Sequence, residues 1–241
     1  MSAKNKLKTG AQQLGLDLST EQLETLLEYM KILREWNQKI NLTAIDKPEE
    51  IVVKHFLDSL SILKVLDLSG SERIIDIGTG AGFPGLVLKI IYPDLKLTLL
   101  DSVKKKVNFL RQAAYQLDLD LDTIEFIHGR AEDLGRNRQH REAYDYVVAR
   151  AVAYLNILSE YALPFVKVGG QFIAQKGESA KKEVVDSQVA LEKLGGETIN
   201  LEAVDLPYNN DDRYLIVIDK IMATASQYPR QAGTPKKNPL N

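Results

Sequence analysis

Glycines that alternate with other small residues, directly after a short apolar run, are the strongest chemical signal in this 241-residue chain. Residues 74–85 read IIDIGTGAGFPG, with the first three glycines at Gly78, Gly80 and Gly82. Glycine adopts positive φ and has no Cβ, so such a loop can turn sharply and bring backbone N–H groups close to a nucleotide. A tight turn that binds nothing seldom needs so many glycines. The segment therefore predicts a nucleotide-binding loop between a strand and a helix.

The residues around these glycines bear on which nucleotide is bound. Gly80, Gly82 and Gly85 fit the G-x-G-x-x-G fingerprint of dinucleotide-binding proteins, which alone is a weak signal. Asp76, two residues before the first glycine, would repel a pyrophosphate but could hold the ammonium group of a methionine moiety. The D-x-G-x-G-x-G order, and the helical segment ahead of the strand, favour S-adenosylmethionine over NAD.

Two further loops are predicted to hold the rest of the nucleotide. Asp101 ends the next apolar run about twenty residues on, where an acid can accept both ribose hydroxyls. That role serves NAD and S-adenosylmethionine equally, and Asp101 could also cap the following helix. Ala131 and Glu132 follow the third run, where a main-chain N–H can read the adenine edge. The alternative for Glu132 is a solvated loop acid.

The segment after the fourth apolar run, RAVA at residues 150–153, bears on the methyl acceptor. Methyltransferases of exocyclic amines place an NPPY-like motif there, so that chemistry is disfavoured. Methylation of cytosine C5 needs a cysteine, and the chain has none. Guanine N7 carries a free lone pair and no proton, so the enzyme needs only alignment and proximity. We therefore expect no catalytic acid–base residue. Arg150 is expected to orient the cofactor carboxylate or an RNA phosphate, with a structural salt bridge as the alternative.

The elements that must position these loops follow from the hydrophobic pattern. Up to about residue 68 the spacing is helical, with Ser19 as the N-cap of a helix that runs to about residue 40. From residue 73 short apolar runs alternate with helical stretches, which predicts an α/β fold with a mostly parallel sheet covered on both faces. We expect helices at 85–91, 103–117, from 155, and 180–194. The expected strands, the last two antiparallel, lie at 73–77, 97–100, 124–127, 146–149, 171–174, 198–203 and 214–218.

Composition limits the remaining possibilities. Hydrophobic residues make up 44% of the chain and charged residues 27%, which is typical of a globular protein. The net charge of −2 means that any nucleic-acid binding must come from local patches. No apolar run reaches membrane-spanning length and no signal core follows the N-terminal lysines, so we expect a cytoplasmic protein. Without cysteine, and with three scattered histidines, no metal site is predicted.

Three parts of the chain are expected to differ in role. They are an N-terminal helical extension (1–69), a methyltransferase domain (70–222) and a basic irregular tail (223–241). RNA binding could use the basic runs at 104–111 and 136–141, but most charge runs are solvated faces. The tail is the best candidate for RNA contact, because a flexible basic segment can follow phosphates and order on binding. The predicted RNA contacts are Arg230, Lys236 and Lys237. No long apolar stripe demands a partner, so we expect a monomer.

Taken together, these residues resemble the bacterial glucose-inhibited division protein B family, which methylates guanine N7 in 16S ribosomal RNA. The resemblance covers nearly the whole chain, and its combination of motifs is specific although each piece alone is not. It rests on WNQKINLT (36–43), HFLDS (55–59), DIGTGAGFPG (76–85), LLDS (99–102), Arg150 with Ala151, and YPRQAGTP (228–235).

The resemblance implies a class I Rossmann-like methyltransferase with a seven-stranded sheet, and S-adenosylmethionine as cofactor. The implied target is a guanine in a small-subunit RNA loop near the decoding site. Lys54 stands where an arginine is expected, which keeps the charge but loses the bidentate fork. His55 and Asp58 are interpreted as a packed, hydrogen-bonded pair. The implied cofactor contacts are Gly78, Phe83, Ala131, Glu132 and Arg150, with Asp101 and Ser102 beside the ribose and adenosine.

Two other classes remain open on the sequence alone. One is an NAD-linked oxidoreductase built on the same sheet, and the other is a nucleotide-binding adaptor for ribosome assembly without activity. Binding of S-adenosylhomocysteine but not of NAD would exclude the oxidoreductase. Methyl transfer to small-subunit RNA would exclude the adaptor.

Overall fold

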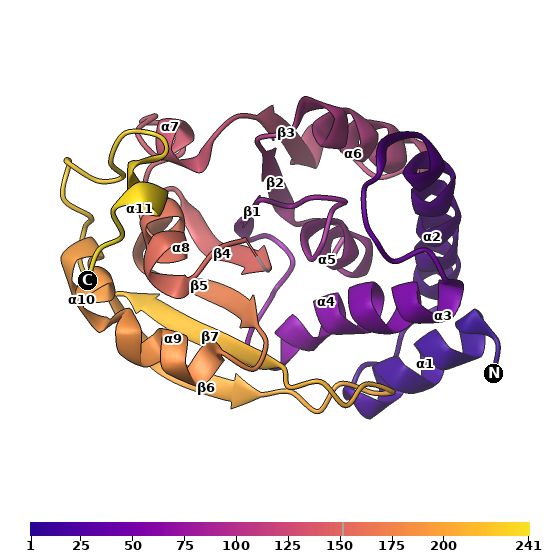
Figure 1. Ribbon diagram of the computed structural model, residues 1–241. Helices are drawn as coiled ribbons and strands as arrows, with labels where there is room; N and C mark the ends of the chain where they lie inside the picture. The colour runs from indigo at the N-terminus through magenta and orange to yellow at the C-terminus, as the bar shows by residue number, and fades with distance from the viewer. Residues whose placement is uncertain (151) are drawn as a thin grey trace.

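A seven-stranded sheet runs through the centre of the molecule in the computed structural model, which describes residues 1–150 and 152–241 (Figure 1). The strand order is β3-β2-β1-β4-β5-β7-β6, and all neighbouring pairs are parallel except those that involve β7. This confirms the mostly parallel sheet and the antiparallel final pair. The strands are β1 (Arg73–Ile77), β2 (Lys96–Asp101), β3 (Ile124–His128), β4 (Tyr144–Arg150), β5 (Val166–Lys176), β6 (Gly196–Ala203) and β7 (Tyr214–Lys220).

The strand order reverses between β1 and β4. From β1 the chain continues to β2 and β3 on one side, whereas β4 and β5 lie on the other. The register pairs Ile74 with Tyr146 and Asp76 with Val148, so the two strands end at the same edge of the sheet. In an open α/β sheet a crevice forms outside the carboxyl ends of the strands at such a reversal. The glycine loop after β1 and Arg150 at the end of β4 both lie there.

Helices cover both faces of the sheet, as the alternating pattern predicts. The N-terminal helices, with α5 and α6, cover one face, and α7 to α10 lie on the other side (Figure 1). The α-helices are α1 (Ala3–Gln13), α2 (Thr20–Ile40), α3 (Pro48–Ile51), α4 (Asp58–Leu60), α5 (Gly85–Ile91), α6 (Lys104–Gln116), α7 (Ala131–Leu134), α8 (Leu155–Ala162), α9 (Ala180–Asp186), α10 (Gln188–Leu194) and α11 (Thr234–Lys237). The chain also forms a π-helical turn, η1 (Val52–Leu57), and two 3₁₀ turns, η2 (Ser61–Lys64) and η3 (Leu121–Thr123).

The N-terminal helices share their core with the sheet. Leu26, Leu33 and Phe56 belong to the same buried apolar cluster as Leu86 of α5 and Phe109 of α6. The Leu stripe of α2 therefore packs against α5 and α6. The predicted capping box of α2 is present, with Ser19 and Gln22 exchanging backbone-to-side-chain bonds of 2.8 and 3.1 Å. These helices position the residues that follow them, at 42–58, over the glycine loop.

Three expected elements are wrong in detail, each for a local reason. The predicted helix 180–194 is two helices that meet at Ser187, whose backbone (φ −103°, ψ 0°) departs from α-helical geometry and ends the first helix. Strand β5 begins at Val166, earlier than predicted. The sequence missed this first part because the exposed residues 167–169 interrupt the apolar run of the strand. The tail is not wholly irregular: it forms α11, and Tyr228 and Leu240 are buried in the core beside α8 and α10.

Candidate functional site

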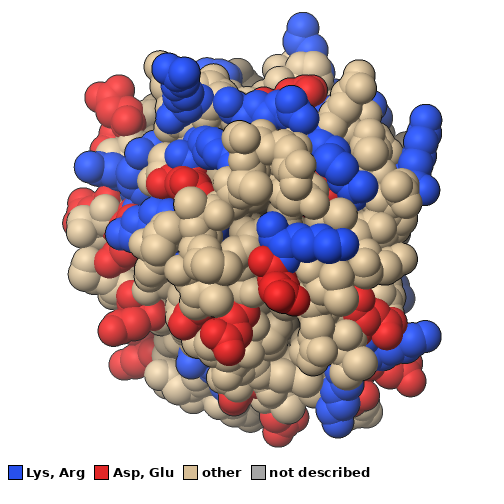
Figure 2. Space-filling model, turned by 90° about the vertical axis from the view of Figure 1, so that its left-hand side faces the viewer, with Lys and Arg blue, Asp and Glu red and all other residues tan. Residues whose placement is uncertain are grey.

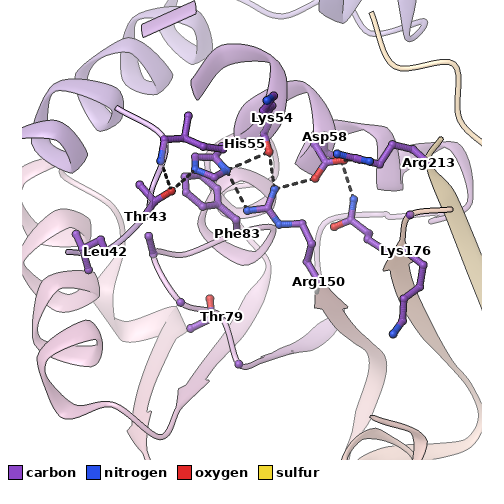
Figure 3. Close-up of a pocket in the computed structure, with 16 residues that line it drawn as sticks. Leu42, Thr43, Lys54, His55, Asp58, Thr79, Phe83, Arg150, Lys176 and Arg213 are labelled. Atoms are coloured by element: carbon purple, nitrogen blue, oxygen red, sulfur yellow. Dashed lines mark hydrogen bonds and ion pairs between the residues drawn. The ribbon is translucent and has the colours of Figure 1, made fainter. Parts of the chain in front are cut away.

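Two cavities open on either side of Gly78 at the reversal point of the sheet. The larger, of about 450 Å³, lies between the glycine loop, residues 42–58 and the ends of β4 and β5 (Figure 3). The smaller, of about 220 Å³, lies between the ends of β1 and β2 and the helices α7 and α8. Gly78 lines both. A molecule that occupied both cavities would therefore cross the glycine loop.

The glycine loop is compatible with such a close approach. Gly78 has φ +67°, and its N–H donates to the carbonyl of Leu100 over 2.8 Å. A Cβ at Gly78 would lie 2.9 Å from a methyl carbon of Val152, which also lines the smaller cavity. Both the backbone conformation and the space therefore require glycine here.

Asp76 braces this loop from beneath. Its Oδ2 accepts hydrogen bonds from Thr79 Oγ1 at 2.7 Å and from the Gly85 N–H at 2.8 Å, which ties the two ends of the loop together. The side chain is fully buried, and burial raises its pKa to about 6. Asp76 lines neither cavity. Asp76 therefore shapes the loop from within the core, and among the described residues its other oxygen, Oδ1, has no hydrogen-bond partner. The contact with an ammonium group stays a prediction.

Asp101 joins the end of β2 to the glycine loop. Its Oδ2 accepts from the Gly80 N–H at 2.9 Å, and its Oδ1 accepts from the Val103 N–H at 2.8 Å. It lines the smaller cavity together with Ser102. The bond to Val103 closes a turn ahead of α6 and is not the helix cap considered from the sequence. The carboxylate is placed where a ribose-binding acid was expected.

Ala131 and Glu132 begin α7 and line the same smaller cavity. Glu132 is only 6% exposed, so the alternative of a solvated loop acid is wrong. Its Oε1 accepts a hydrogen bond from the Gly233 N–H at 2.9 Å. The smaller cavity is therefore connected through Glu132 to the C-terminal segment of the chain.

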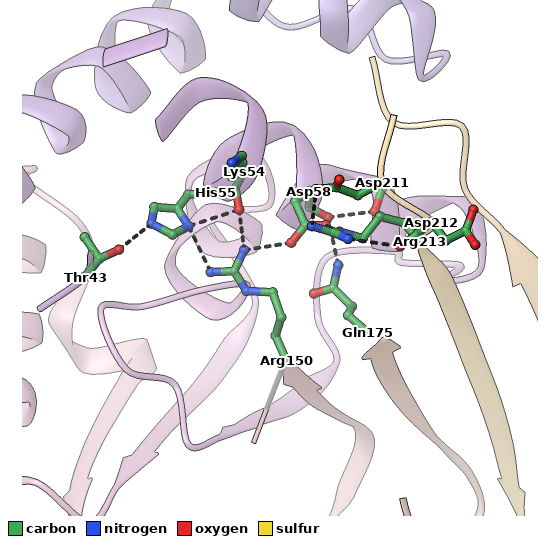
Figure 4. Close-up of polar contacts among 10 residues, drawn as sticks. Thr43, Lys54, His55, Asp58, Arg150, Gln175, Asp211, Asp212 and Arg213 are labelled. Carbon is green, nitrogen blue, oxygen red and sulfur yellow. Dashed lines mark hydrogen bonds and ion pairs between the residues drawn. The ribbon is translucent and has the colours of Figure 1, made fainter. Parts of the chain in front are cut away.

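Arg150 lies in the wall of the larger cavity, held by polar groups of η1 and α4 (Figure 4). Its Nη1 donates to Asp58 Oδ2 at 2.8 Å and to the Lys54 carbonyl at 2.9 Å, and its Nη2 lies 3.2 Å from His55 Nδ1. Its guanidinium also lies over the ring of Phe83, 5.1 Å from the centroid. The structural salt bridge considered from the sequence is therefore present.

His55 and Asp58 do not bond to each other, which corrects the predicted pair. Arg150 lies between them, and Arg213, the residue just before β7, places its Nε 3.3 Å from Asp58 Oδ1 (Figure 4). Asp58 is therefore shared by two arginines from distant parts of the chain. Nothing in the local sequence connects Arg213 with residues 54–58, so the sequence could not reveal this contact.

His55 stays neutral in this environment. Its ring stacks on Phe83 with 4.5 Å between centroids, and burial, with a further contribution from Arg150, lowers its pKa to about 3. Thr43 Oγ1 lies 2.9 Å from Nε2, and the Lys54 carbonyl lies 3.0 Å from Nδ1. Both ring nitrogens thus have partners, and His55 offers no free base to a substrate.

Tyr29 is a second residue that the sequence did not single out. It lies fully buried in α2, and its hydroxyl donates to the carbonyl of Ala81 in the glycine loop. In the sequence it is one apolar position in a leucine-rich helix, with no signal that it supports the loop. The N-terminal helices thus contribute directly to the geometry of the glycine loop.

The predicted RNA contacts divide into two groups. Arg230 is paired with the buried Glu160 at 2.6 Å, so it is not available on a flexible arm. Arg136 and Arg141 of the second basic run likewise donate to main-chain carbonyls of residues 224–229. Lys236 and Lys237 are exposed on α11. Lys and Arg gather across the upper part of the face that carries the C-terminal segment (Figure 2).

Two absences are observed within residues 1–150 and 152–241. No group of three or more His, Cys, Asp or Glu residues is placed to hold a metal ion. No helix is both long and apolar enough to span a bilayer. Ala151, which was part of one sequence motif, lies outside the described residues.

The sheet order and the glycine loop at its reversal point define a class I, Rossmann-like methyltransferase fold. A solved S-adenosylmethionine-dependent methyltransferase from Aquifex aeolicus matches with a TM-score of 0.54 at 16% identity, over 74% of this chain and 96% of that one. Geranyl diphosphate C-methyltransferase from Streptomyces coelicolor A3(2), solved with S-adenosyl-L-homocysteine, gives a TM-score of 0.56 at 13% identity, over 80% and 98%. These likenesses show the fold.

Sequence relatives show the family. Residues 22–211 match the family described as rRNA small subunit methyltransferase G. Ribosomal RNA small subunit methyltransferase G of Alkaliphilus metalliredigens is 51% identical over 240 residues, covering 100% of both chains. The Bacillus cereus protein of that name is 46% identical over 229 residues, covering 95% of both. The chain belongs to the rRNA small subunit methyltransferase G family, which confirms the resemblance.

Proposed function

We propose that this protein transfers the methyl group of S-adenosylmethionine to N7 of a guanine in 16S ribosomal RNA. The observation that carries the proposal is the pair of cavities that meet at Gly78, in a chain of this family. A cofactor with a nucleoside at one end and an amino acid at the other needs such a divided site. The donor supplies an electrophilic methyl group on a sulfonium.

The smaller cavity suits the adenosine half. Asp101 and Ser102 lie at the end of β2, where ribose hydroxyls are bound in this class of sheet. Ala131 and Glu132 supply the wall beside the base. On the other side of Gly78, Phe83 and Arg150 belong to the methionine half. Gly80 holds Asp101 through its main-chain N–H and so links the two halves.

The larger cavity also suits an anionic acceptor. Lys54, Arg150, Lys176 and Arg213 line it, with Asp58 as the one lining carboxylate among the described residues. Such a cationic wall favours a nucleic-acid backbone. His55 and Asp58, which both line this cavity, already have partners. The site therefore aligns an acceptor that needs no deprotonation, as guanine N7 does not.

RNA contact outside the cavity is proposed for Lys236 and Lys237, which are exposed beside the smaller cavity's helices. Arg230 is assigned to the fold and not to RNA because its guanidinium is paired with Glu160. The protein is proposed to act as a monomer on the small ribosomal subunit.

The proposal is tested by binding and by product analysis. Calorimetry should show binding of S-adenosylhomocysteine and none of NAD. The purified protein should transfer labelled methyl groups to 30S subunits from a strain that lacks this protein, and the product should be 7-methylguanosine at one position of 16S RNA. Binding of NAD would support an oxidoreductase, and cofactor binding without transfer to naked RNA or subunits would support a non-catalytic assembly factor.

A further inference from the structure

The C-terminal strap, which we define as residues 228–237, lies across α7 and α8 on the side of the smaller cavity (Figure 1). The strap itself lines neither cavity. It is the segment that the sequence singled out as a basic RNA-binding arm. Its contacts indicate a different role.

The first anchor of the strap is an ion pair with α8. Glu160 is fully buried, and its two oxygens accept bonds from Arg230 Nε at 2.9 and 3.1 Å and from Nη2 at 2.6 Å. The main-chain N–H of Arg230 adds a fourth bond, at 2.8 Å to Oε1. A buried carboxylate is stable in its charged form only with such complete pairing. The position of α8 and that of the strap are therefore fixed together.

The second anchor is the bond from the Gly233 N–H to Glu132 Oε1 of α7. Gly233 has φ +86° and precedes α11, so the donor is presented by a turn that favours glycine. Arg136 and Arg141 add bonds to the carbonyls of Pro229 and Tyr228, at 2.9 and 2.7 Å. The strap is thus docked along its length on the segment around α7.

Both anchored helices supply the wall of the smaller cavity. Glu132 itself lines the cavity, and so does Tyr161, the residue that follows Glu160 on α8. We propose that the strap positions this wall for the nucleoside half of the cofactor, with Arg230 acting through Glu160 and the Gly233 N–H acting through Glu132. This inference rests on the proposed function, because it takes the smaller cavity as the nucleoside site.

The strap and the cofactor should affect each other's binding, because thermodynamic linkage is reciprocal. If the docked strap favours the cofactor-binding geometry of Glu132 and Tyr161, bound cofactor must in turn favour the docked strap. A strap that only stabilises the fold would show neither effect once the protein is folded.

The first experiment measures affinity of the full-length protein for S-adenosylhomocysteine by calorimetry. Arg230→Lys keeps the charge that Glu160 requires but loses the bidentate fork. We expect its dissociation constant to rise about tenfold. Arg138→Lys is the matched control, since Arg138 is exposed on the neighbouring loop and should leave the affinity unchanged. Exchanging both Lys236 and Lys237 for alanine should also leave cofactor affinity unchanged, because neither anchors the strap.

A second variant separates positioning from folding. Glu160→Leu combined with Arg230→Ala removes the buried charge together with its partner, so no unpaired carboxylate remains to unfold α8. We expect a folded protein whose affinity for S-adenosylhomocysteine is again about tenfold weaker. A folded double variant with wild-type affinity would overturn the proposal.

Amide hydrogen exchange of the wild-type protein tests the opposite direction of the linkage, the effect of bound cofactor on the strap. Saturating S-adenosylhomocysteine should slow exchange at Gly233 and across residues 228–237, although these residues do not line the cavity. Unchanged exchange there, in protein that binds the ligand, would overturn the strap proposal and leave the proposed function standing. Failure of the wild-type protein to bind S-adenosylhomocysteine at all would instead overturn the proposed function.

Discussion

Arg150 and Arg230 each hold a buried carboxylate, but the two regions around them differ in charge balance. At the strap, one arginine satisfies one carboxylate, with four bonds between Arg230 and Glu160. At the larger cavity, Arg150 and Arg213 share the carboxylate of Asp58, and Arg213 also lies 3.8 Å from Asp211. Lys176 is paired with Glu183, and the lining Lys54 is in no ion pair among the described residues. The strap pair is electrically complete, whereas the cavity keeps an excess of positive charge.

The number of arginines per carboxylate indicates which arginines are structural and which can bind a ligand, and this cannot be seen in the sequence. A complete pair has nothing left to offer an incoming anion, and its loss leaves a buried charge unpaired. A shared carboxylate leaves donor capacity for a ligand, and it tolerates loss of one arginine because the other remains. Stability should therefore depend more on Arg230, and activity more on Arg150.

The largest expected effect is on stability at the strap. Arg230→Met should lower the free energy of unfolding by about 3–5 kcal/mol, because Glu160 would remain buried without a partner. Urea denaturation followed by circular dichroism measures this loss. Arg138→Met, at an exposed site, should change stability by less than about 0.5 kcal/mol. Equal stabilities of the two variants would show that the buried carboxylate of Glu160 does not depend on Arg230.

Arg150→Met should show the opposite pattern. We expect kcat/KM for methyl transfer to 30S subunits to fall on the order of a hundredfold, since alignment at the larger cavity is disturbed. Its loss of stability should be smaller than that of Arg230→Met, because Asp58 keeps Arg213 at 3.3 Å. A variant that unfolds as readily as Arg230→Met would show that Asp58 depends on Arg150 alone.

The sequence predicted best the features that local pattern determines. Strand 73–77 and helix 85–91 coincide with β1 and α5, because a buried apolar run, a glycine loop and Pro84 all occur within one short segment. The smaller-cavity residues Asp101 and Glu132 were found for a similar reason: each follows a strand whose carboxyl end must lie at the reversal of the sheet.

The sequence failed where a side chain's role depends on a distant partner. Asp58 looks like the partner of His55 from its spacing, but its ion pairs are with Arg150 and Arg213, which lie far along the chain. Arg230 looks like an RNA contact from the basic composition of the tail, but its partner Glu160 lies seventy residues away. Composition cannot reveal such pairs, because only the folded chain brings them together.

Gly78→Ala tests whether the wall between the two cavities must be free of a side chain. The new methyl would lie 2.9 Å from Val152, at the wall shared by the two cavities, so we expect cofactor affinity to fall more than about tenfold. Gly80→Ala is the matched control, since Gly80 has a similar φ of +62° but its Cβ would meet only the Gly78 carbonyl oxygen, at 3.9 Å. Calorimetry with S-adenosylhomocysteine should give the weaker binding for Gly78→Ala. The same affinity for both variants would mean that backbone strain and not the shared wall controls binding.

The smallest expected effect is a pH dependence of the free energy of unfolding that comes from His55 in the larger cavity. His55 has a pKa of about 3 in the folded protein and about 6.5 when unfolded, so the unfolded chain binds more protons between these values. Its contribution to stability is therefore fully present above pH 6.5 and is lost as the pH falls toward 3. Compared with His55→Gln, the wild-type advantage in free energy of unfolding should shrink by about 1 kcal/mol per pH unit below 6.5. Urea titrations of both proteins at pH 7, 6 and 5 measure it, and a constant difference would show that folding does not lower the pKa of His55. Because His55 is already neutral at pH 7 and guanine N7 loses no proton, the pH profiles of methyl transfer by the wild type and by His55→Gln should have the same shape. A fall in activity near pH 6 that both proteins share would come from Asp76, whose pKa is about 6.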